Sequence, residues 1–451
     1  MAKQFIRFSL LLLLLTVTLF ATSACVFDCF GVMTTAEDTT TNAPTVTTAP
    51  ESTTAETTKP PITAAPVTTE EVYRPGTPGL ILESSGDGTA KVMGITDNAA
   101  TTIEIPEYTT DGDRVIEIVA GAFSQNAALE ELILPKNVYK IGANAFFGCE
   151  KLKSISFSEG LDIIGLNAFS GCTALETLHF PASLSELAPA AFSGCTALKH
   201  LTVADGGSTF RHEGNCLIQK NGNVLVLGTA GSKIPKTVEA IGEQAFYNMG
   251  VTGILMPDSV KSVGKQAFGM NPALSTLVLS ESLTELSDLA FYRCTALTAV
   301  YLPESLTHIG LTPFRGCAAL TRLTVAKDNP TYTVEGNCLI EKETLTLVQG
   351  FVNSVIPASV KAIGNAAFSM MPVTAVTLPD GCVTIGAEAF AHTYALKAIT
   401  LPATLTEIHA TAFRYANALT TLTYQGSEEA FSALTEGVTL PEGVTVIYTE
   451  E

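Results

Sequence analysis

Residues 174–195 read ALETLHFPASLSELAPAAFSGC, and units of the same form recur along most of the 451-residue chain. The first eight residues alternate between apolar and polar side chains, which predicts a short strand. Pro181 ends that strand, because proline has no N–H to donate to a ladder. Leu184 and Leu187 then face inward from a second short extended segment, and Phe192 fills the turn that returns the chain.

A phenylalanine in this turn sets the period of the repeat. Its successive spacings are 23, 23, 23, 54, 22, 23, 23, 54, 22 and 23 residues. One unit cannot bury its own apolar face, so neighbouring units must stack to close a core. The expected fold class is therefore a repeat solenoid, mainly β with short turns or helical turns, of about 23 residues per coil. The repeated residues are Phe123, Phe146, Phe169, Phe192, Phe246, Phe268, Phe291, Phe314, Phe368, Phe390 and Phe413.

The two long spacings contain related insertions, near residues 204–233 and 326–355. The first includes FRHEGNCLI from Phe210, and the second includes YTVEGNCLI from Tyr332. Each predicts a β-hairpin, with the NGN triplet at 221–223 as a turn signal in the first. Such loops commonly carry binding, but these two could equally be decorations of the repeat.

The repeated unit resembles the BspA-type leucine-rich repeat of bacterial surface proteins. The resemblance covers about residues 80–450 and rests on eleven in-phase copies of the Phe turn. It implies a leucine-rich-repeat solenoid with two β-hairpin insertions, displayed at the cell surface and associated with adhesion. A shared fold is a weak warrant for function, so the ligand has to be argued from the residues.

The first 24 residues read as a signal peptide. Lys3 and Arg7 form a short basic region, an apolar run follows, and small residues precede Cys25. The residues before Cys25 resemble a bacterial lipobox, in which that cysteine is acylated, although Thr22 stands where the family usually has Leu, Val or Ile. We therefore expect an exported protein at the cell surface, anchored to the membrane only through a lipid on Cys25. The alternative is ordinary cleavage and secretion.

The mature chain divides by composition. Residues 25–71 form a Thr/Pro-rich stalk that cannot bury a core and is expected to be disordered. Residues 72–120 are assigned to an N-terminal cap and first repeat, 121–424 to the solenoid, and 425–451 to a C-terminal cap. Caps are expected because an open solenoid end exposes a bare sheet edge.

Nothing in the sequence predicts an enzyme, a metal site or a cofactor. The chain has no HExxH, GxSxG or P-loop motif. Its net charge of −19 argues against nucleic acid as a partner, and we expect a monomer. Five cysteines lie three residues after a repeat Phe, in a slot that elsewhere accepts Met249 or Ala416, so they are interpreted as core residues. These are Cys149, Cys172, Cys195, Cys294 and Cys317.

The candidate ligand face is the outward side of the first strand of each coil. Leu255, Val278 and Tyr301 should form an apolar stripe between the two insertions, flanked by Thr276 and Arg322. Ordinary β-propensity would also explain these residue types, whereas a contiguous exposed apolar stripe often marks an interface. The expected partner is an extracellular protein or glycan, and the competing hypothesis is an envelope scaffold or spacer with no dedicated ligand.

Overall fold

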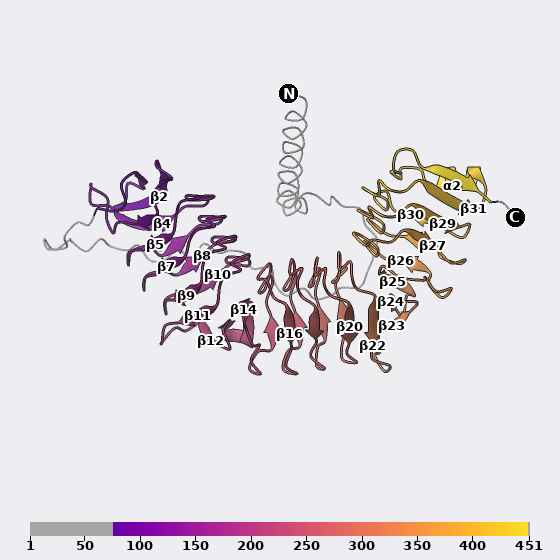
Figure 1. Ribbon diagram of the computed structural model, residues 1–451, viewed down its shortest axis with the longest axis horizontal. Coiled ribbons are helices and arrows are strands. Elements are labelled where there is room, and N and C mark those ends of the chain that lie inside the picture. Colours follow the sequence, from indigo (N-terminus) through magenta and orange to yellow (C-terminus); the bar gives the residue numbers. More distant parts are fainter. Residues whose placement is uncertain (1–74, 450–451) are drawn as a thin grey trace, which may run out of the picture. The chain divides into compact units, whose positions relative to one another are not determined.

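The computed structural model describes residues 75–449, so the signal segment, Cys25 and the stalk lie outside the described residues. Short strands follow one another through this region, and the coils stack in chain order (Figure 1). Within the described range the helical segments are the 3-10 helix η1 (Asn221–Asn223) and the α-helix α2 (Glu428–Leu434). The prediction of a mainly β repeat solenoid is confirmed.

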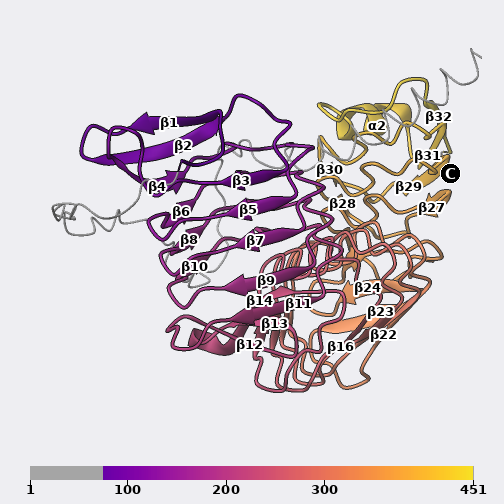
Figure 2. The ribbon, with the colours of Figure 1, turned by 60° about the vertical axis from the view of Figure 1, so that its left-hand side comes forward.

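Each coil starts with a short strand that alternates between core and solvent, and we call these the face strands. In β9 (Thr177–Phe180) the Leu178 and Phe180 side chains are buried, whereas Thr177 and His179 are exposed. Face strands pair in parallel within short ladders, such as β3 (Thr102–Glu104) with β5 (Glu131–Ile133) and β7 (Ser154–Ser156). Figure 2 shows these three strands and β9 side by side. The other face strands are β3 (Thr102–Glu104), β5 (Glu131–Ile133), β7 (Ser154–Ser156), β11 (His200–Val203), β16 (Gly253–Leu255), β18 (Thr276–Val278), β20 (Ala299–Leu302), β22 (Arg322–Val325), β27 (Ala375–Thr377), β29 (Ala398–Pro402) and β31 (Thr421–Gln425).

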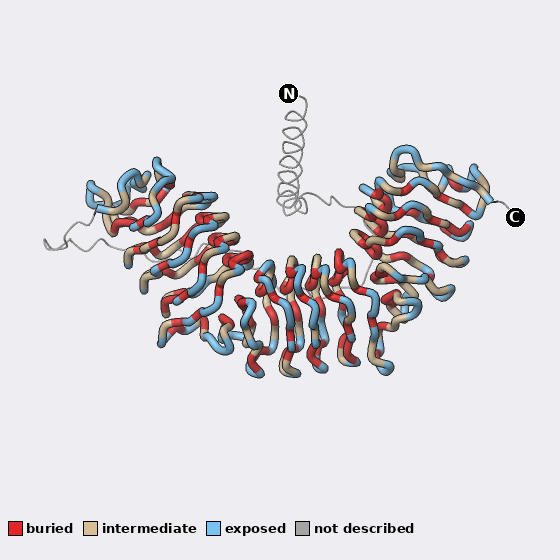
Figure 3. Tube along the Cα trace, in the orientation of Figure 1, coloured by how far each residue is buried: buried red, intermediate tan, exposed pale blue. Residues whose placement is uncertain are grey.

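A second strand in each coil builds three longer sheets. Each of these sheets starts with antiparallel strands and continues as a parallel ladder: β1-β2-β4-β6-β8-β10, β12-β13-β14-β15-β17-β19-β21 and β23-β24-β25-β26-β28-β30. The antiparallel strands are β1 (Leu80–Ser84) and β2 (Thr89–Ile95), then β12 (Phe210–Glu213), β13 (Cys216–Gln219) and β14 (Val224–Gly228), and then β23 (Tyr332–Glu335), β24 (Cys338–Glu341) and β25 (Thr346–Gln349). Buried and exposed segments alternate within each coil (Figure 3). The second strands are β4 (Arg114–Ile118), β6 (Lys140–Ile141), β8 (Ile163–Ile164), β10 (Glu186–Leu187), β15 (Ala240–Ile241), β17 (Ser262–Val263), β19 (Glu285–Leu286), β21 (His308–Ile309), β26 (Ala362–Ile363), β28 (Thr384–Ile385) and β30 (Glu407–Ile408).

The repeat phenylalanines stack ring on ring inside the solenoid. Phe146 and Phe169 lie 5.0 Å apart between ring centroids with an interplanar angle of 0°. Backbone hydrogen bonds join the coils beside these rings, and the N–H of Phe146 donates to the carbonyl oxygen of Ala168 at 2.7 Å. The resulting columns run from Phe123 to Phe192, from Phe246 to Phe314 and from Phe368 to Phe413, and the insertions separate them.

Each insertion is a three-stranded unit rather than one hairpin. In the first, β12 (Phe210–Glu213) pairs antiparallel with β13 (Cys216–Gln219), which pairs antiparallel with β14 (Val224–Gly228). The predicted NGN turn lies in η1, between β13 and β14. The sequence interpretation missed the earlier turn, which Gly214 and Asn215 form with φ of 59° and 62°. The second insertion repeats the arrangement with β23 (Tyr332–Glu335), β24 (Cys338–Glu341) and β25 (Thr346–Gln349).

Both ends of the described region carry covering elements. At the N-terminal end β1 (Leu80–Ser84) pairs antiparallel with β2 (Thr89–Ile95), which runs parallel to β4. At the other end β32 (Thr445–Tyr448) extends the face ladder beside β31. Helix α2 precedes it, and the Ser427 side chain caps the helix by accepting from the N–H of Ala430 at 3.2 Å. Phe431 of this helix is buried, so the helix packs on the last coil.

Candidate binding face

The apolar stripe predicted from the sequence lies on three neighbouring face strands, β16, β18 and β20. Leu255, Val278 and Tyr301 expose 71%, 47% and 47% of their surfaces. Leu255 is the cross-strand partner of Val278, and β18 lies in contact with β20. Thr276 and Arg322 are exposed on the flanks of the stripe. The alternation that defines the face therefore holds in these coils.

The side chains opposite the stripe explain why it faces outward. Ile254 and Val300 are buried, and Leu277 is partly buried against the core. Because side chains on a strand alternate between faces, the neighbours of these three residues must point to solvent. The core therefore does not need an apolar residue at any position of the stripe.

The insertions close the hydrogen-bonding edges of the neighbouring face strands. The Asn215 side-chain oxygen accepts from the N–H of Leu201 at 2.9 Å, and Asn337 accepts from Leu323 at 3.1 Å. His212 accepts in the same way from Val203, at 3.1 Å. The insertions thus pack back on β11 and β22 and divide the face, leaving β16 to β22 as the segment that carries the stripe.

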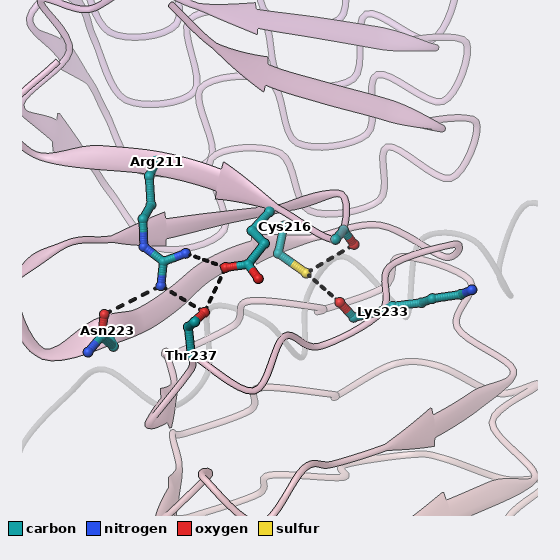
Figure 4. A network of polar contacts seen from close by, with 7 residues as sticks. Arg211, Cys216, Asn223, Lys233 and Thr237 are labelled. Carbon is teal, nitrogen blue, oxygen red and sulfur yellow. Dashed lines mark hydrogen bonds and ion pairs between the residues drawn. The ribbon is translucent and has the colours of Figure 1, made fainter. Parts of the chain in front are cut away.

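The first insertion also forms an open polar hollow of about 590 Å³. Arg211 pairs with Glu213 at 2.7 Å and donates to Thr237 at 3.0 Å, and Thr237 donates in turn to Glu213 at 2.7 Å (Figure 4). The bonds from Thr237 and Arg211 lower the pKa of the Glu213 carboxyl, so it stays ionised and keeps the network paired. The lining residues are Arg211, Asn223, Lys236, Thr237, Glu239, Ser259 and Lys261.

The second insertion lacks the three basic side chains that line this hollow. An offset of 122 residues relates the two insertions, as in Cys216 and Cys338. The positions equivalent to Arg211, Lys236 and Lys261 are taken by Thr333, Ala358 and Val383. Sequence reasoning missed this hollow because its residues come from three separate parts of the chain that only the coil stacking brings together. The difference in charge between the two insertions was the signal available.

The cysteines of the Phe turn are buried and have no disulfide partner. The Cys149 thiol donates to the carbonyl oxygen of Phe123, 3.2 Å away in the preceding coil. Burial raises the pKa of Cys149 to about 11 and that of Cys195 to about 12, despite an opposing backbone hydrogen bond at each thiol. Thiols that stay protonated near neutral pH are poor nucleophiles and poor metal ligands, so these serve packing.

The histidines and carboxylates of the described region form no recognisable reactive cluster. His179 contacts Thr202 through its Nδ1 atom at 2.8 Å, on the exposed side of the face ladder. Within residues 75–449, no group of three or more His, Cys, Asp or Glu side chains is placed to hold a metal ion. No helix in that same range has the length and apolar character needed to cross a membrane.

The sequence matches the family described as the BspA type leucine-rich repeat region, over residues 116–213, 230–346 and 339–449. The match covers most of the chain, so the protein belongs to this family of bacterial leucine-rich-repeat proteins, whose members are typically surface proteins. None of the curated proteins compared with the sequence matches it.

Several solved structures of bacterial leucine-rich-repeat proteins are similar to this chain. A leucine rich cell surface protein of Faecalibacterium prausnitzii is 22% identical, with a TM-score of 0.39, and the alignment covers 82% of this chain and 98% of that one. A leucine-rich repeat protein of Eubacterium ventriosum is 18% identical, with a TM-score of 0.44, over 80% and 89%. The pneumococcal vaccine antigen PcpA is 17% identical, with a TM-score of 0.43, over 82% and 86%.

Proposed function

We propose that this protein is a non-enzymatic binding module of the cell surface, which docks an extracellular partner on the apolar stripe. The carrying observation is the exposure of Leu255, Val278 and Tyr301 on adjacent strands. The partner is an extracellular protein or a glycan. The stripe itself favours a protein, because branched aliphatic side chains offer area for apolar burial and no hydrogen bonds to sugar hydroxyl groups.

The duplicated part of the chain supports a role for the stripe beyond strand formation. At the offset of 122 residues, the positions of Leu255, Val278 and Tyr301 are taken by Thr377, Thr400 and Thr423. These threonines lie on the same face of parallel strands, where Thr377 pairs with Thr400 and Thr400 pairs with Thr423. The fold therefore accepts hydroxyl side chains at all three positions, and the apolar residues are not required for the strands to form.

The flanks of the stripe fit the anatomy of an interface. Binding sites commonly combine an apolar centre containing an aromatic residue with a polar rim in which arginine is enriched. Tyr301 supplies the aromatic ring, and Arg322 and Thr276 lie at the rim. A patch of this composition can anchor a partner while its rim excludes wrong ones.

We also propose a cellular location for the protein. The chain is exported and held at the membrane by acylation of Cys25, because a diacylated cysteine supplies the two chains that stable anchoring needs. The mass of the mature N-terminal peptide tests this proposal. A lipid-modified peptide starting at Cys25 supports anchoring, whereas an unmodified mature chain in the culture medium establishes secretion.

The binding proposal is tested with the exported chain on a panel of extracellular-matrix proteins and a glycan array. We expect saturable binding that is lost in the double variant Leu255→Asp/Tyr301→Asp. The matched control is Thr377→Asp/Thr423→Asp, which places the same charges on the equivalent positions of the same face and should bind normally. Equal binding by both variants would move the site away from the stripe, and no binding by the parent would favour the scaffold hypothesis.

A further inference from the structure

Two exposed tyrosines lie together on the Phe turns of the last two coils. Tyr394 and Tyr415 expose 65% and 48% of their surfaces. His392 lies between them, with its ring centroid 5.8 Å from that of Tyr394 and 4.8 Å from that of Tyr415. The His392 ring is inclined by 66° to the Tyr394 ring and by 31° to the Tyr415 ring, and we call these three neighbouring rings the aromatic platform.

The aromatic platform does not serve the repeat core. His392 and Tyr415 occupy the position two residues after the repeat Phe, where the backbone is left-handed, with φ of 57° and 58°. Glycine fills this position in other coils, at Gly148 and Gly171 for example, because it adopts this conformation without strain. At the offset of 122 residues that relates the two insertions, Met270 and Pro272 are equivalent to His392 and Tyr394. Rings are thus an addition specific to the last coils.

The tyrosine hydroxyl groups are already engaged within the chain. The Tyr394 hydroxyl lies 2.8 Å from Nδ1 of His392, and Arg414 donates to the Tyr415 hydroxyl at 3.3 Å. The Arg414 guanidinium also lies over the Tyr415 ring, 4.9 Å from its centroid. These contacts fix the rings before any ligand arrives, which reduces the entropy lost on binding.

Charged groups border the rings on one side. Glu388 lies 4.0 Å from Arg414 and 3.7 Å from Arg315, so the carboxylate is held between two guanidinium groups. Arg414 keeps 52% of its side chain exposed and Glu388 keeps 36%. Arg414 therefore places exposed hydrogen-bond donors beside the Tyr415 ring, and the Glu388 carboxylate that it pairs with supplies acceptors.

We propose that the aromatic platform is a carbohydrate-binding site. A sugar ring has one face of C–H groups and an edge of hydroxyl groups, and the platform offers the complementary pair. The negative face of an aromatic ring attracts the C–H face, while Arg414 and Glu388 reach the hydroxyl edge. The site is separate from the apolar stripe, so the same chain can hold a glycan at its last coils and a protein on its face strands.

The test uses a glycan array followed by titration of the exported chain with the oligosaccharide that binds best. The chain contains no tryptophan, so tyrosine emission can follow the titration directly. We expect binding to weaken at least tenfold in Tyr394→Ala and in Tyr415→Ala. Leu166→Ala is the control, because Leu166 is 45% exposed but lies outside both the aromatic platform and the apolar stripe, and it should bind like the parent.

Thermal melting of each variant shows whether the fold is intact, and Tyr394→Phe keeps the ring for comparison should Tyr394→Ala lose stability. Loss of binding in folded alanine variants, with the control unaffected, supports the site. The proposal is overturned if no glycan binds, if folded Tyr394→Ala and Tyr415→Ala bind normally, or if binding is lost instead in Leu255→Asp/Tyr301→Asp. Protein binding lost in that last variant bears only on the stripe, so the two proposals fail separately.

Discussion

The Cys317 thiol donates a hydrogen bond to the carbonyl oxygen of Phe291, 3.1 Å away in the preceding coil. Equivalent bonds from four other cysteines link further pairs of coils at 3.2 to 3.4 Å. Asn271 makes the same connection through its amide, donating to the Phe246 carbonyl at 2.8 Å. The slot three residues after the repeat Phe is thus a hydrogen-bonding position as well as a packing position.

Three of these slots hold no hydrogen-bond donor, at Met249, Met371 and Ala416. Met249 and Met371 each follow an insertion, so no repeat Phe precedes them in the stack. Ala416 follows the coil of Phe390, whose carbonyl accepts from the Thr393 hydroxyl at 2.6 Å. The slot after each insertion therefore holds a methionine, which has no donor to satisfy.

We predict that Cys317→Ala lowers the free energy of unfolding by about 1–2 kcal/mol, through the lost hydrogen bond and the small cavity. Urea denaturation measures the change. Cys382→Ala is the control, because Cys382 is equally buried but its thiol makes a long contact of 3.8 Å with the Thr384 carbonyl. Equal losses in the two variants would show that the bond to Phe291 adds nothing.

Stability should fall as the pH rises above 9. Burial raises the pKa of Cys149, Cys216 and Cys338 from 9.0 to about 11, so these thiols keep their protons in the fold while the unfolded chain releases them. The unfolded state then binds fewer protons, and each such thiol costs about 1.4 kcal/mol per pH unit between 9 and 11. Unfolding in urea at pH 8, 9 and 10 measures the slope. It should be shallower in Cys149→Ala, and an unchanged slope would contradict the assignment.

Removing one ring from the Phe column should be costly. Phe291 is fully buried and stacks on Phe268 and Phe314 at 5.2 and 5.4 Å, so Phe291→Ala is expected to cost roughly 3–5 kcal/mol. Tyr301→Ala, ten residues away on the exposed face, should change stability by less than about 0.5 kcal/mol. Calorimetric melting of both variants distinguishes them, and equal losses would mean that Tyr301 packs inside.

A methyl group added at Gly228 should disrupt the junction after the first insertion. A Cβ there would overlap the ring of Phe246, whereas a Cβ at Gly231 would meet no atom within 4 Å. We expect Gly228→Ala to lose about 1–3 kcal/mol, as in overpacked cores, and Gly231→Ala to stay near the parent. Thermal melting compares the two. A neutral Gly228→Ala would show that the junction can move to admit the methyl group.

Much of the fold could be predicted because the repeat imposes one phase on every coil. The outward assignment of Leu255 follows from its place next to Ile254 in an alternating strand, and the structure shows that alternation. The repeat pattern does not predict the structure of segments whose residues do not follow it. Helix α2 was missed for that reason, although Ser427 followed by Glu428 and Glu429 is a local signature of a helix start.

The candidate sites divide in the same way. The apolar stripe could be proposed because its three members occupy the same position in successive coils. The hollow around Arg211 could not, because it combines residues at unrelated positions, such as Arg211 with Thr237. In the aromatic platform His392 and Tyr415 share one repeat position, but the contact of Arg315 with Glu388 beside it joins coils that are not neighbours in the sequence. Those contacts are made by long side chains that extend from one coil to another. The spacing of residues along the sequence does not predict them.

The offset of 122 residues between the two insertions has a consequence for how such a chain can change length. Phe210 and Tyr332 begin equivalent insertions, and each is followed by the same order of strands. Joining the residue before Phe210 to Tyr332 would remove one whole block while every remaining coil kept a neighbour of the right register. Recombination between the two blocks could therefore shorten or lengthen the solenoid in steps of one block. The junction between a coil and the following insertion would be the same as in the present chain.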